Sequence, residues 1–196
     1  MKNNLLSEHL TYNGDNGTHT HVHLLRYSAE HFDESICTTF EDIVAKGTNE
    51  SKLWVRVHGL KDTEYIKNIC THFKINFLMM QDILNVDHPS KIEKNGDFNF
   101  VVTRIFHGDV VSSVRLIQGQ DVVLTFTEGE ATFFDDAVKA LQENVLKIRT
   151  RTSDYLFSVL FNELVSSYVS LAIEIGDQLD DLETELLAAT TSYNIR

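Results

Sequence analysis

The chain of 196 residues is 42% hydrophobic, enough for one sizeable core, and carries a formal net charge of −12. This acidic balance argues against nucleic acid or an anionic membrane surface as a partner, because clustered Lys and Arg bind phosphate, and it favours cations as ligands. Cys37 and Cys70 are too few for a disulfide framework and are expected to be small core residues.

Targeting and membrane segments are not expected from the residue pattern. Residues 1–9 lack the continuous apolar core of a secretion signal, and no later stretch is expected to approach the ~18 uncharged apolar residues of a membrane span. We therefore expect one soluble domain over residues 1–196, with an α/β core over 1–151 and a long amphipathic helix over 152–196.

The first third of the chain is predicted to mix strands and helices. An opening hairpin is predicted over Leu10–Tyr27, with its second strand at His21–Tyr27. Apolar spacing predicts a helix over Asp33–Lys46, whereas alternation and β-branched residues predict a strand over Lys52–His58. Asp62 is expected to cap the helix that follows this strand.

Three histidines alternate near the start of the chain, at His19, His21 and His23. A strand would place them on one face, which is typical of a metal site, but at ~3.3 Å per residue the outer two lie ~13 Å apart at the backbone. That separation is too large for one ion to bridge comfortably. A pair with a ligand from elsewhere stays open, although a polar strand face that collects adventitious metal is the preferred interpretation.

Asn76–Asn85 is predicted to be a short helix with Asn76 as its cap. Gln81 and Asp82 are expected to point away from its apolar arc and to present an amide and a carboxylate side by side at the surface. At 100° per residue, that arc is formed by Phe77, Met79, Met80, Ile83 and Leu84.

An antiparallel meander is predicted to follow this helix. Its first two strands, Ser90–Glu93 and Phe98–His107, flank a hairpin turn at Lys94–Asp97. Val110–Gln118 and Asp121–Thr127 are rich in β-branched residues and continue the meander.

The apolar period becomes helical after Ala131. One helix is predicted from Phe134 to Ile148, and a second begins at Ser153 and continues to about Leu186 without a proline. At 1.5 Å per residue the second helix is a rod of more than ~50 Å, longer than a compact domain needs, so we expect it to find a partner outside the core. Its distal half carries many acidic residues: Glu174, Asp177, Asp180, Asp181, Glu183 and Glu185.

A solvated helix face is enough to explain these carboxylates. The sharper alternative is a surface that concentrates divalent cations, which are hard ions and prefer oxygen ligands. Neither interpretation requires catalysis.

Several motifs occur in a fixed order between about Lys52 and Glu185. They are Trp54-x-x-x-x-Gly-Leu60, the helix ending in Asp82-Ile-Leu-Asn85, and His88-Pro-x-Lys-Ile-Glu93. This arrangement resembles the cytosolic domain of the CorA family of magnesium channels. The resemblance implies an α/β/α domain, with a mixed, largely antiparallel sheet between two sets of helices and a long final helix. The two membrane helices of that family and its Gly-Met-Asn pore motif would lie beyond Arg196.

The resemblance also implies a function. The chain would be the regulatory cytosolic domain of a divalent cation channel, sensing intracellular magnesium at subunit interfaces and gating magnesium uptake, and it would not be an enzyme. Full-length members are pentamers, so a homo-oligomer is expected at the cytoplasmic face of the plasma membrane, reaching the membrane only through residues beyond Arg196. Magnesium would be both the regulatory and the transported ion.

Asp82 is the residue that the resemblance assigns to the regulatory magnesium site. It would supply half of that site at a subunit interface, with the partner carboxylate beyond Arg196. A second cation site of some members falls on Gln81 and Asn162, which are uncharged amides and weaker ligands for hard cations, so that site is not expected in the same form.

Three alternatives stay open. The histidines keep the zinc-transporting branch of the family in consideration, as well as cobalt and nickel as transported ions. A freestanding, oligomeric metal-sensing scaffold would use the long helix for assembly. A hydrolase would use the alternating histidines with Asp33 or Asp15 on a metal, but the sequence offers no His-Glu-x-x-His helix and no phosphate-binding glycine loop in its support.

Overall fold

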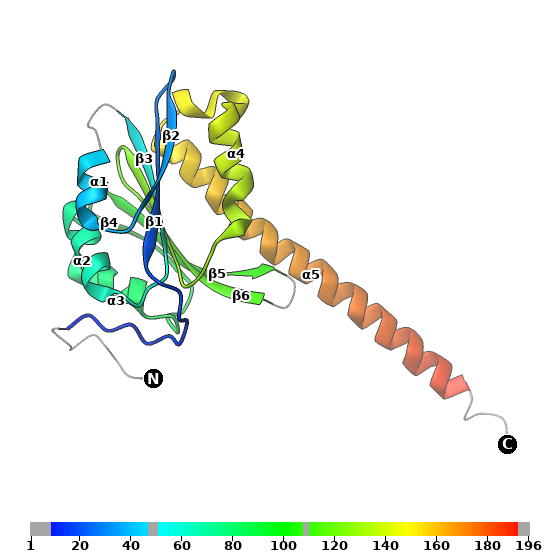
Figure 1. The fold of residues 1–196 in the computed structure, drawn as a ribbon. Coiled ribbons are helices and arrows are strands. Elements are labelled where there is room, and N and C mark those ends of the chain that lie inside the picture. Colours follow the sequence, from blue (N-terminus) through cyan, green and yellow to red (C-terminus); the bar gives the residue numbers. More distant parts are fainter. Residues whose placement is uncertain (1–8, 47–50, 108–109, 192–196) are drawn as a thin grey trace.

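A mixed sheet of seven strands forms the centre of the computed structural model, which describes residues 9–46, 51–107 and 110–191 (Figure 1). Its order is β2-β1-β3-β7-β6-β5-β4, and every neighbouring pair is antiparallel except β3 with β7. The strands are β1 (His21–Tyr27), β2 (Phe32–Cys37), β3 (Lys52–His58), β4 (Lys91–Asn95), β5 (Phe98–His107), β6 (Val110–Gln118) and β7 (Val122–Thr127).

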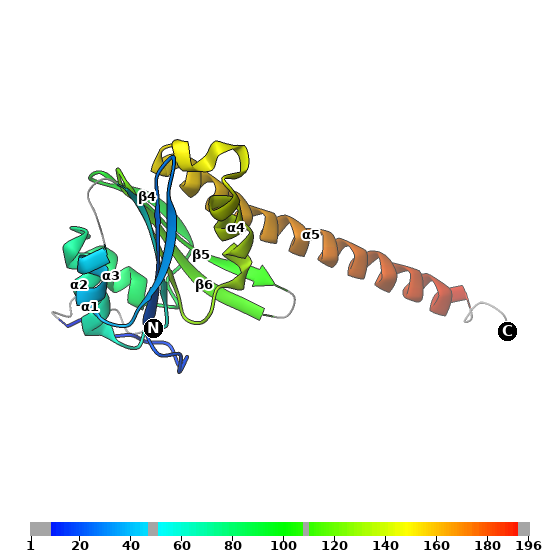
Figure 2. The ribbon, with the colours of Figure 1, turned by 45° about the horizontal axis from the view of Figure 1, so that its top comes forward.

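Helices cover both faces of this sheet (Figures 1 and 2). One face carries α1 (Phe40–Lys46), α2 (Thr63–His72) and α3 (Phe77–Leu84). The other carries η2 (Thr132–Phe134), α4 (Asp135–Glu143), η3 (Val145–Thr150) and the first turns of α5 (Ser153–Thr191). The predicted α/β/α architecture is therefore confirmed.

Strand alternation divides the core between the two faces. On β3, Val55 and Val57 pack toward the side of α2 and α3, whereas Trp54 packs toward the side of α4 and α5. Both cysteines are buried on the first side. Since the central strands are enclosed by helices on both faces, they are apolar along most of their length.

The elements with local capping or turn signals formed as predicted. Asp62 accepts a hydrogen bond from the backbone N–H of Tyr65 at 2.9 Å, and Asn76 accepts one from Met79 at 3.0 Å, so both helix starts are capped by their own sequence. The turn at residues 94–97 joins β4 and β5, and the meander β4-β5-β6-β7 is confirmed.

The predictions for residues 10–46 were partly wrong. Residues 10–20 form no strand, and the first hairpin is β1 with β2. The predicted helix over Asp33–Lys46 is helical only from Phe40, because Phe32–Cys37 pairs along the free edge of β1 instead. Ile36 had supplied part of the helical spacing, but it is exposed on this edge strand.

The single helix predicted from Phe134 to Ile148 is also wrong. It is interrupted at Asn144, which has a φ of 55° and a ψ of 40°, and the left-handed conformation continues at Leu146 and Lys147. Asn tolerates this conformation well and often ends a helix. The chain thus turns between α4 and η3, and Val145 lies exposed rather than in the apolar stripe.

Helix α5 is long, as predicted, and has two distinct halves. Leu156, Leu160 and Leu164 are buried against the sheet, whereas the distal half projects away from the body (Figures 1 and 2). By length and composition α5 is apolar enough to cross a membrane, a criterion that core helices of soluble proteins also meet. This corrects the expectation that no stretch approaches a membrane span, because Glu163 is the single charged residue between Asp154 and Glu174.

Candidate metal sites

Asp82 lies on α3 beneath the segment that leads to β4. One carboxylate oxygen is 3.2 Å from Nε2 of His88, the other is 2.7 Å from Nζ of Lys91, and the side chain is only 15% exposed. Nζ of Lys91 also lies 3.1 Å from Glu93. Desolvation disfavours the charge of Lys91, but hydrogen bonds to the two carboxylates outweigh it and raise the pKa of Lys91. The charge of Asp82 is therefore balanced within the chain.

The expected pair of surface groups on α3 was wrong for Gln81, which is 5% exposed and hence buried. Phe77, predicted to face the core, lies exposed instead. Asp82 itself is also largely covered, because the chain folds back after α3 and brings His88 and Lys91 onto its carboxylate. Helical periodicity identifies the side that faces the sheet, but it does not show that a following loop covers another side.

A buried arginine holds the C-terminal end of α3. Arg115 on β6 is fully buried; its Nη2 donates to the carbonyl of Asn85 at 2.6 Å, and its Nε donates to the carbonyl of Asp82 at 3.3 Å. Carbonyls at this end of a helix lack partners within the helix. Burial lowers the pKa of Arg115 to about 10, so the guanidinium stays charged at neutral pH and fixes the backbone beneath Asp82.

The other predicted oxygen ligands lie apart from Asp82. Asn162 is exposed on α5, which covers the face of the sheet opposite α3. Farther along, α5 projects from the body (Figure 1), and the acidic residues of this half are exposed; they include Glu174, Asp177, Asp180 and Asp181. Within the described chain, α3 and α5 do not combine their polar residues into one site.

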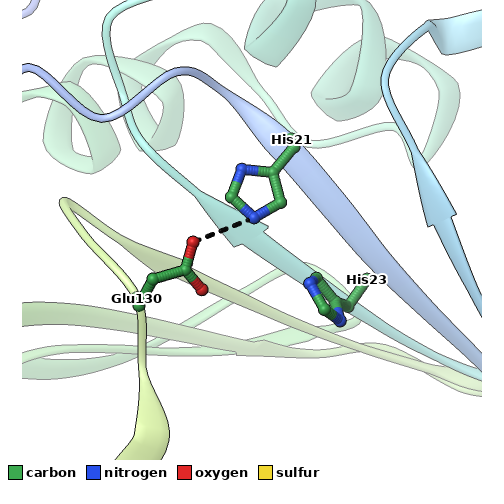
Figure 3. A group of neighbouring side chains, drawn as sticks. All are labelled: His21, His23 and Glu130. Atoms are coloured by element: carbon green, nitrogen blue, oxygen red, sulfur yellow. Dashed lines mark ion pairs between the residues drawn. The ribbon is translucent and has the colours of Figure 1, made fainter.

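A second group of ligands lies near one end of the central strands (Figure 3). His21 and His23 point from β1 toward Glu130, which follows the end of β7. One ligand atom from each residue lies within 4.8 Å of the other two, and Nε2 of His21 is 3.1 Å from a carboxylate oxygen of Glu130. In the part of the chain that the structure describes, this is the group of three His, Cys, Asp or Glu side chains that is close enough to hold an ion.

A third imidazole packs against this group. His58 on β3 pairs with His21 across the strands, and its ring stacks on that of His21 with centroids 5.3 Å apart. Nδ1 of His58 lies 3.2 Å from the carbonyl of Gly129. Burial lowers the pKa of His58 to about 4, so the ring is neutral at physiological pH and adds no positive charge beside the site.

The sequence had drawn attention to His21 and His23, but not to Glu130 or His58. His58 ends a predicted strand and Glu130 comes just after another. Their position at strand ends is the feature of the sequence that could have indicated a place in this site. Asp33, which the hydrolase hypothesis placed with the histidines, instead pairs with Arg26 at 2.6 Å. That contact lowers the pKa of the Asp33 carboxyl.

With this architecture in place, the comparison with known proteins identifies the family. Residues 49–196 match the profile of the family described as "CorA-like Mg2+ transporter protein". The chain belongs to the CorA family. The resemblance drawn from the sequence motifs is thereby confirmed, and the family is one of transporters.

The relatives of this CorA-family chain include transporters from bacteria and archaea. It is 29% identical over 184 residues to the "Cobalt/magnesium transport protein CorA" of Thermotoga maritima, an alignment that covers 91% of the chain and 52% of the relative. The complete CorA magnesium transporter of Methanocaldococcus jannaschii superposes with a TM-score of 0.61 at 17% identity, over 85% of this chain and 51% of the other.

The cytoplasmic domain of ZntB from Vibrio parahaemolyticus has the same fold, with a TM-score of 0.59 at 11% identity, over 81% of this chain and 64% of the other. At such low identities the two solved structures establish the fold alone. The chain spans about half the length of the curated relative and of the complete archaeal transporter.

Proposed function

We propose that this CorA-family chain is the cytosolic regulatory part of a divalent cation channel that senses intracellular magnesium where neighbouring subunits meet and gates magnesium uptake. The observation that carries the proposal is the projecting half of α5. This half leaves the α/β/α body with apolar side chains exposed along it: Val169, Ile173, Ile175, Leu179 and Leu182.

Such a helix requires a partner. A large exposed apolar surface on a soluble protein marks an interaction site, and identical copies arranged around a rotation axis would cover equivalent helices. A homo-oligomer at the cytoplasmic face of the plasma membrane, pentameric as the family resemblance implies, satisfies this requirement. The projecting half would then lie beside the α5 helices of neighbouring subunits.

Asp82 is the proposed magnesium ligand. Mg²⁺ keeps several waters and needs only one or two carboxylates, so a half-site on one subunit is sufficient when a neighbour supplies the rest. Within the chain, Lys91 and His88 already contact the two carboxylate oxygens of Asp82. Magnesium must therefore displace the ammonium of Lys91 from Asp82, and this competition would set the concentration at which the ion is sensed.

The test is magnesium uptake by the complete protein that contains this chain, reconstituted in vesicles that hold a fluorescent magnesium indicator. Internal magnesium should stop uptake by the wild type, and Asp82→Ala should require a several-fold higher internal concentration. Glu64→Gln is the control, since it removes an exposed carboxylate that pairs with Lys67 on α2 and leaves Asp82, His88 and Lys91 in place; it should be inhibited at the same internal magnesium as the wild type.

The outcomes separate the hypotheses. Equal inhibition of the wild type and Asp82→Ala would contradict magnesium sensing at this residue. Uptake of zinc without uptake of magnesium would favour the zinc-transporting alternative, and the absence of any uptake would favour the freestanding scaffold.

A further inference from the structure

The cluster formed by His21, His23 and Glu130 has the dimensions of a metal site. A tetrahedral ion with bonds of about 2.0–2.1 Å places its ligand atoms about 3.4 Å apart. One atom from each of the three residues lies within 4.8 Å of the others, and one pair is already at 3.1 Å. Side-chain rotations that move the ligand atoms by about 1 Å would therefore bring all three atoms within bonding distance of one ion.

The hydrogen bonds of His21 prepare it to bind a cation. Its Nδ1 lies 2.9 Å from the carbonyl oxygen of His19, and only an N–H can donate to a carbonyl, so this nitrogen carries the proton. Nε2 then faces the carboxylate of Glu130 at 3.1 Å. An imidazole lone pair and a carboxylate oxygen repel each other unless a proton or a metal ion lies between them. The geometry thus leaves a place for a positive charge.

His23 is held in a similar way. Its Nδ1 lies 3.2 Å from a carboxylate oxygen of Glu34, which favours a proton on that nitrogen and leaves the lone pair on Nε2. Metal-binding histidines usually donate their other ring N–H to a carboxylate or a carbonyl, which fixes the ring and strengthens its basicity. His21 has a carbonyl partner and His23 a carboxylate partner, so both rings meet this requirement.

The surroundings balance charge and leave access. Arg56 pairs with His23 across the strands, but its guanidinium donates to the carbonyl of Ala131 and contacts Asp135 at 3.3 Å. Its charge is therefore partly compensated. A cavity of about 520 Å³, lined in part by His23, His58 and Glu130, lies beside the cluster and offers space for water as a fourth ligand.

We propose that His21, His23 and Glu130 bind a divalent transition-metal ion of the class of Zn²⁺, Co²⁺ and Ni²⁺, with water completing the coordination. Two imidazoles and one carboxylate suit these ions, whereas Mg²⁺ prefers a shell of oxygen ligands only. The site is separate from Asp82, which lies on α3 at the other face of the sheet. It would give the protein a means of responding to a second kind of cation, and it does not depend on the function proposed above.

The first experiment is titration of the 196-residue chain, free of any histidine tag, with Co²⁺ and Zn²⁺. The visible absorption of Co²⁺ reports on coordination geometry, and calorimetry gives stoichiometry and affinity for Zn²⁺. The wild type should bind one ion per chain with a tetrahedral Co²⁺ spectrum, and millimolar Mg²⁺ should not displace it. An octahedral Co²⁺ spectrum, or competition by Mg²⁺ at similar concentrations, would overturn the assignment.

Three variants make the test specific. His23→Ala and Glu130→Gln should each weaken Zn²⁺ binding by at least about tenfold. Glu130 is 62% exposed, so Glu130→Gln should leave the fold intact. This variant therefore still tests the site if His23→Ala folds poorly. His19→Ala is the matched control, because it removes an exposed imidazole but keeps the backbone carbonyl that orients His21.

The control separates a built site from a histidine-rich surface that collects metal. Zn²⁺ affinity should be unchanged in His19→Ala, whereas an equal loss in His19→Ala and His23→Ala would contradict the proposal. Asp82→Ala should also bind Zn²⁺ as the wild type does. A failure of zinc binding would therefore leave magnesium sensing untouched, and a failure of magnesium sensing would leave the zinc site untouched.

Discussion

Replacing Arg115 would show how strongly the position of Asp82 depends on a buried charge. The guanidinium is fully buried on β6 and donates to the carbonyls of Asp82 and Asn85 at the end of α3. Arg115→Ala removes both hydrogen bonds and leaves a cavity, whereas Arg115→Met removes the hydrogen bonds but keeps much of the volume. Arg104 on the neighbouring strand β5 is exposed, so Arg104→Met provides the control for the loss of one positive charge.

The expected magnitudes follow from these contacts. A hydrogen bond from a charged donor contributes about 1.5–3 kcal/mol, and leaving a buried acceptor without a partner costs about 1–3 kcal/mol. Both variants remove the hydrogen bonds to the two carbonyls, so we expect Arg115→Met, which keeps much of the volume, to lose about 1–3 kcal/mol. Arg115→Ala should lose more than Arg115→Met, because the cavity adds to the loss.

Urea unfolding followed by circular dichroism measures these free energies. Arg104→Met should lie within about 0.5 kcal/mol of the wild type, as exposed substitutions usually do. If Arg115→Ala unfolds at the same urea concentration as Arg104→Met, the contacts of Arg115 with α3 do not stabilise the fold and the reasoning is refuted.

Two more expectations concern pH and backbone strain. The pKa of His58 is about 4 in the fold and about 6.5 in the unfolded chain. Its contribution to the free energy of unfolding is therefore complete above pH 6.5 and is lost as the pH falls toward 4, by up to about 3 kcal/mol. Urea unfolding in EDTA should show a smaller loss of stability between pH 7.5 and pH 4.5 for His58→Gln than for the wild type, and equal losses would contradict this. Leu146 has a φ of 52° and is 75% exposed, so Leu146→Gly should raise the free energy of unfolding by up to about 1 kcal/mol in thermal unfolding, whereas Val145→Gly, without a positive φ, should lower it.

The parts of the fold that were predicted correctly are those whose signals are local. Asp62 and Asn76 cap helices through hydrogen bonds that span three residues, and the turn at residues 94–97 joins adjacent strands. Edge strand β2 was missed because its conformation depends on pairing with β1, which helical spacing around Ile36 obscured.

The candidate sites show the same division. Alternation along β1 was enough to place His21 and His23 on one face, but Glu130 reaches them only because β1, β3 and β7 lie side by side in the sheet. Likewise, the polar residues of α3 were assigned to its surface, whereas Arg115 and Lys91 come from strands that follow the helix in sequence. Sequence periodicity describes one element at a time, and these contacts join several.

The parallel pairing of β3 with β7 has a consequence for how the protein folds. Strands β1, β2 and β3 form one antiparallel unit and strands β4 to β7 form another. The parallel register from Leu53 opposite Val122 to His58 opposite Thr127 joins the two units. Each unit can form from contacts that are nearer in sequence, whereas joining them closes a long loop, so this junction should form late in folding. His21 and Glu130 lie on opposite sides of it. An ion held between them would therefore bind only after β3 and β7 have paired. The appearance of Co²⁺ absorption during refolding would then report when this late pairing forms.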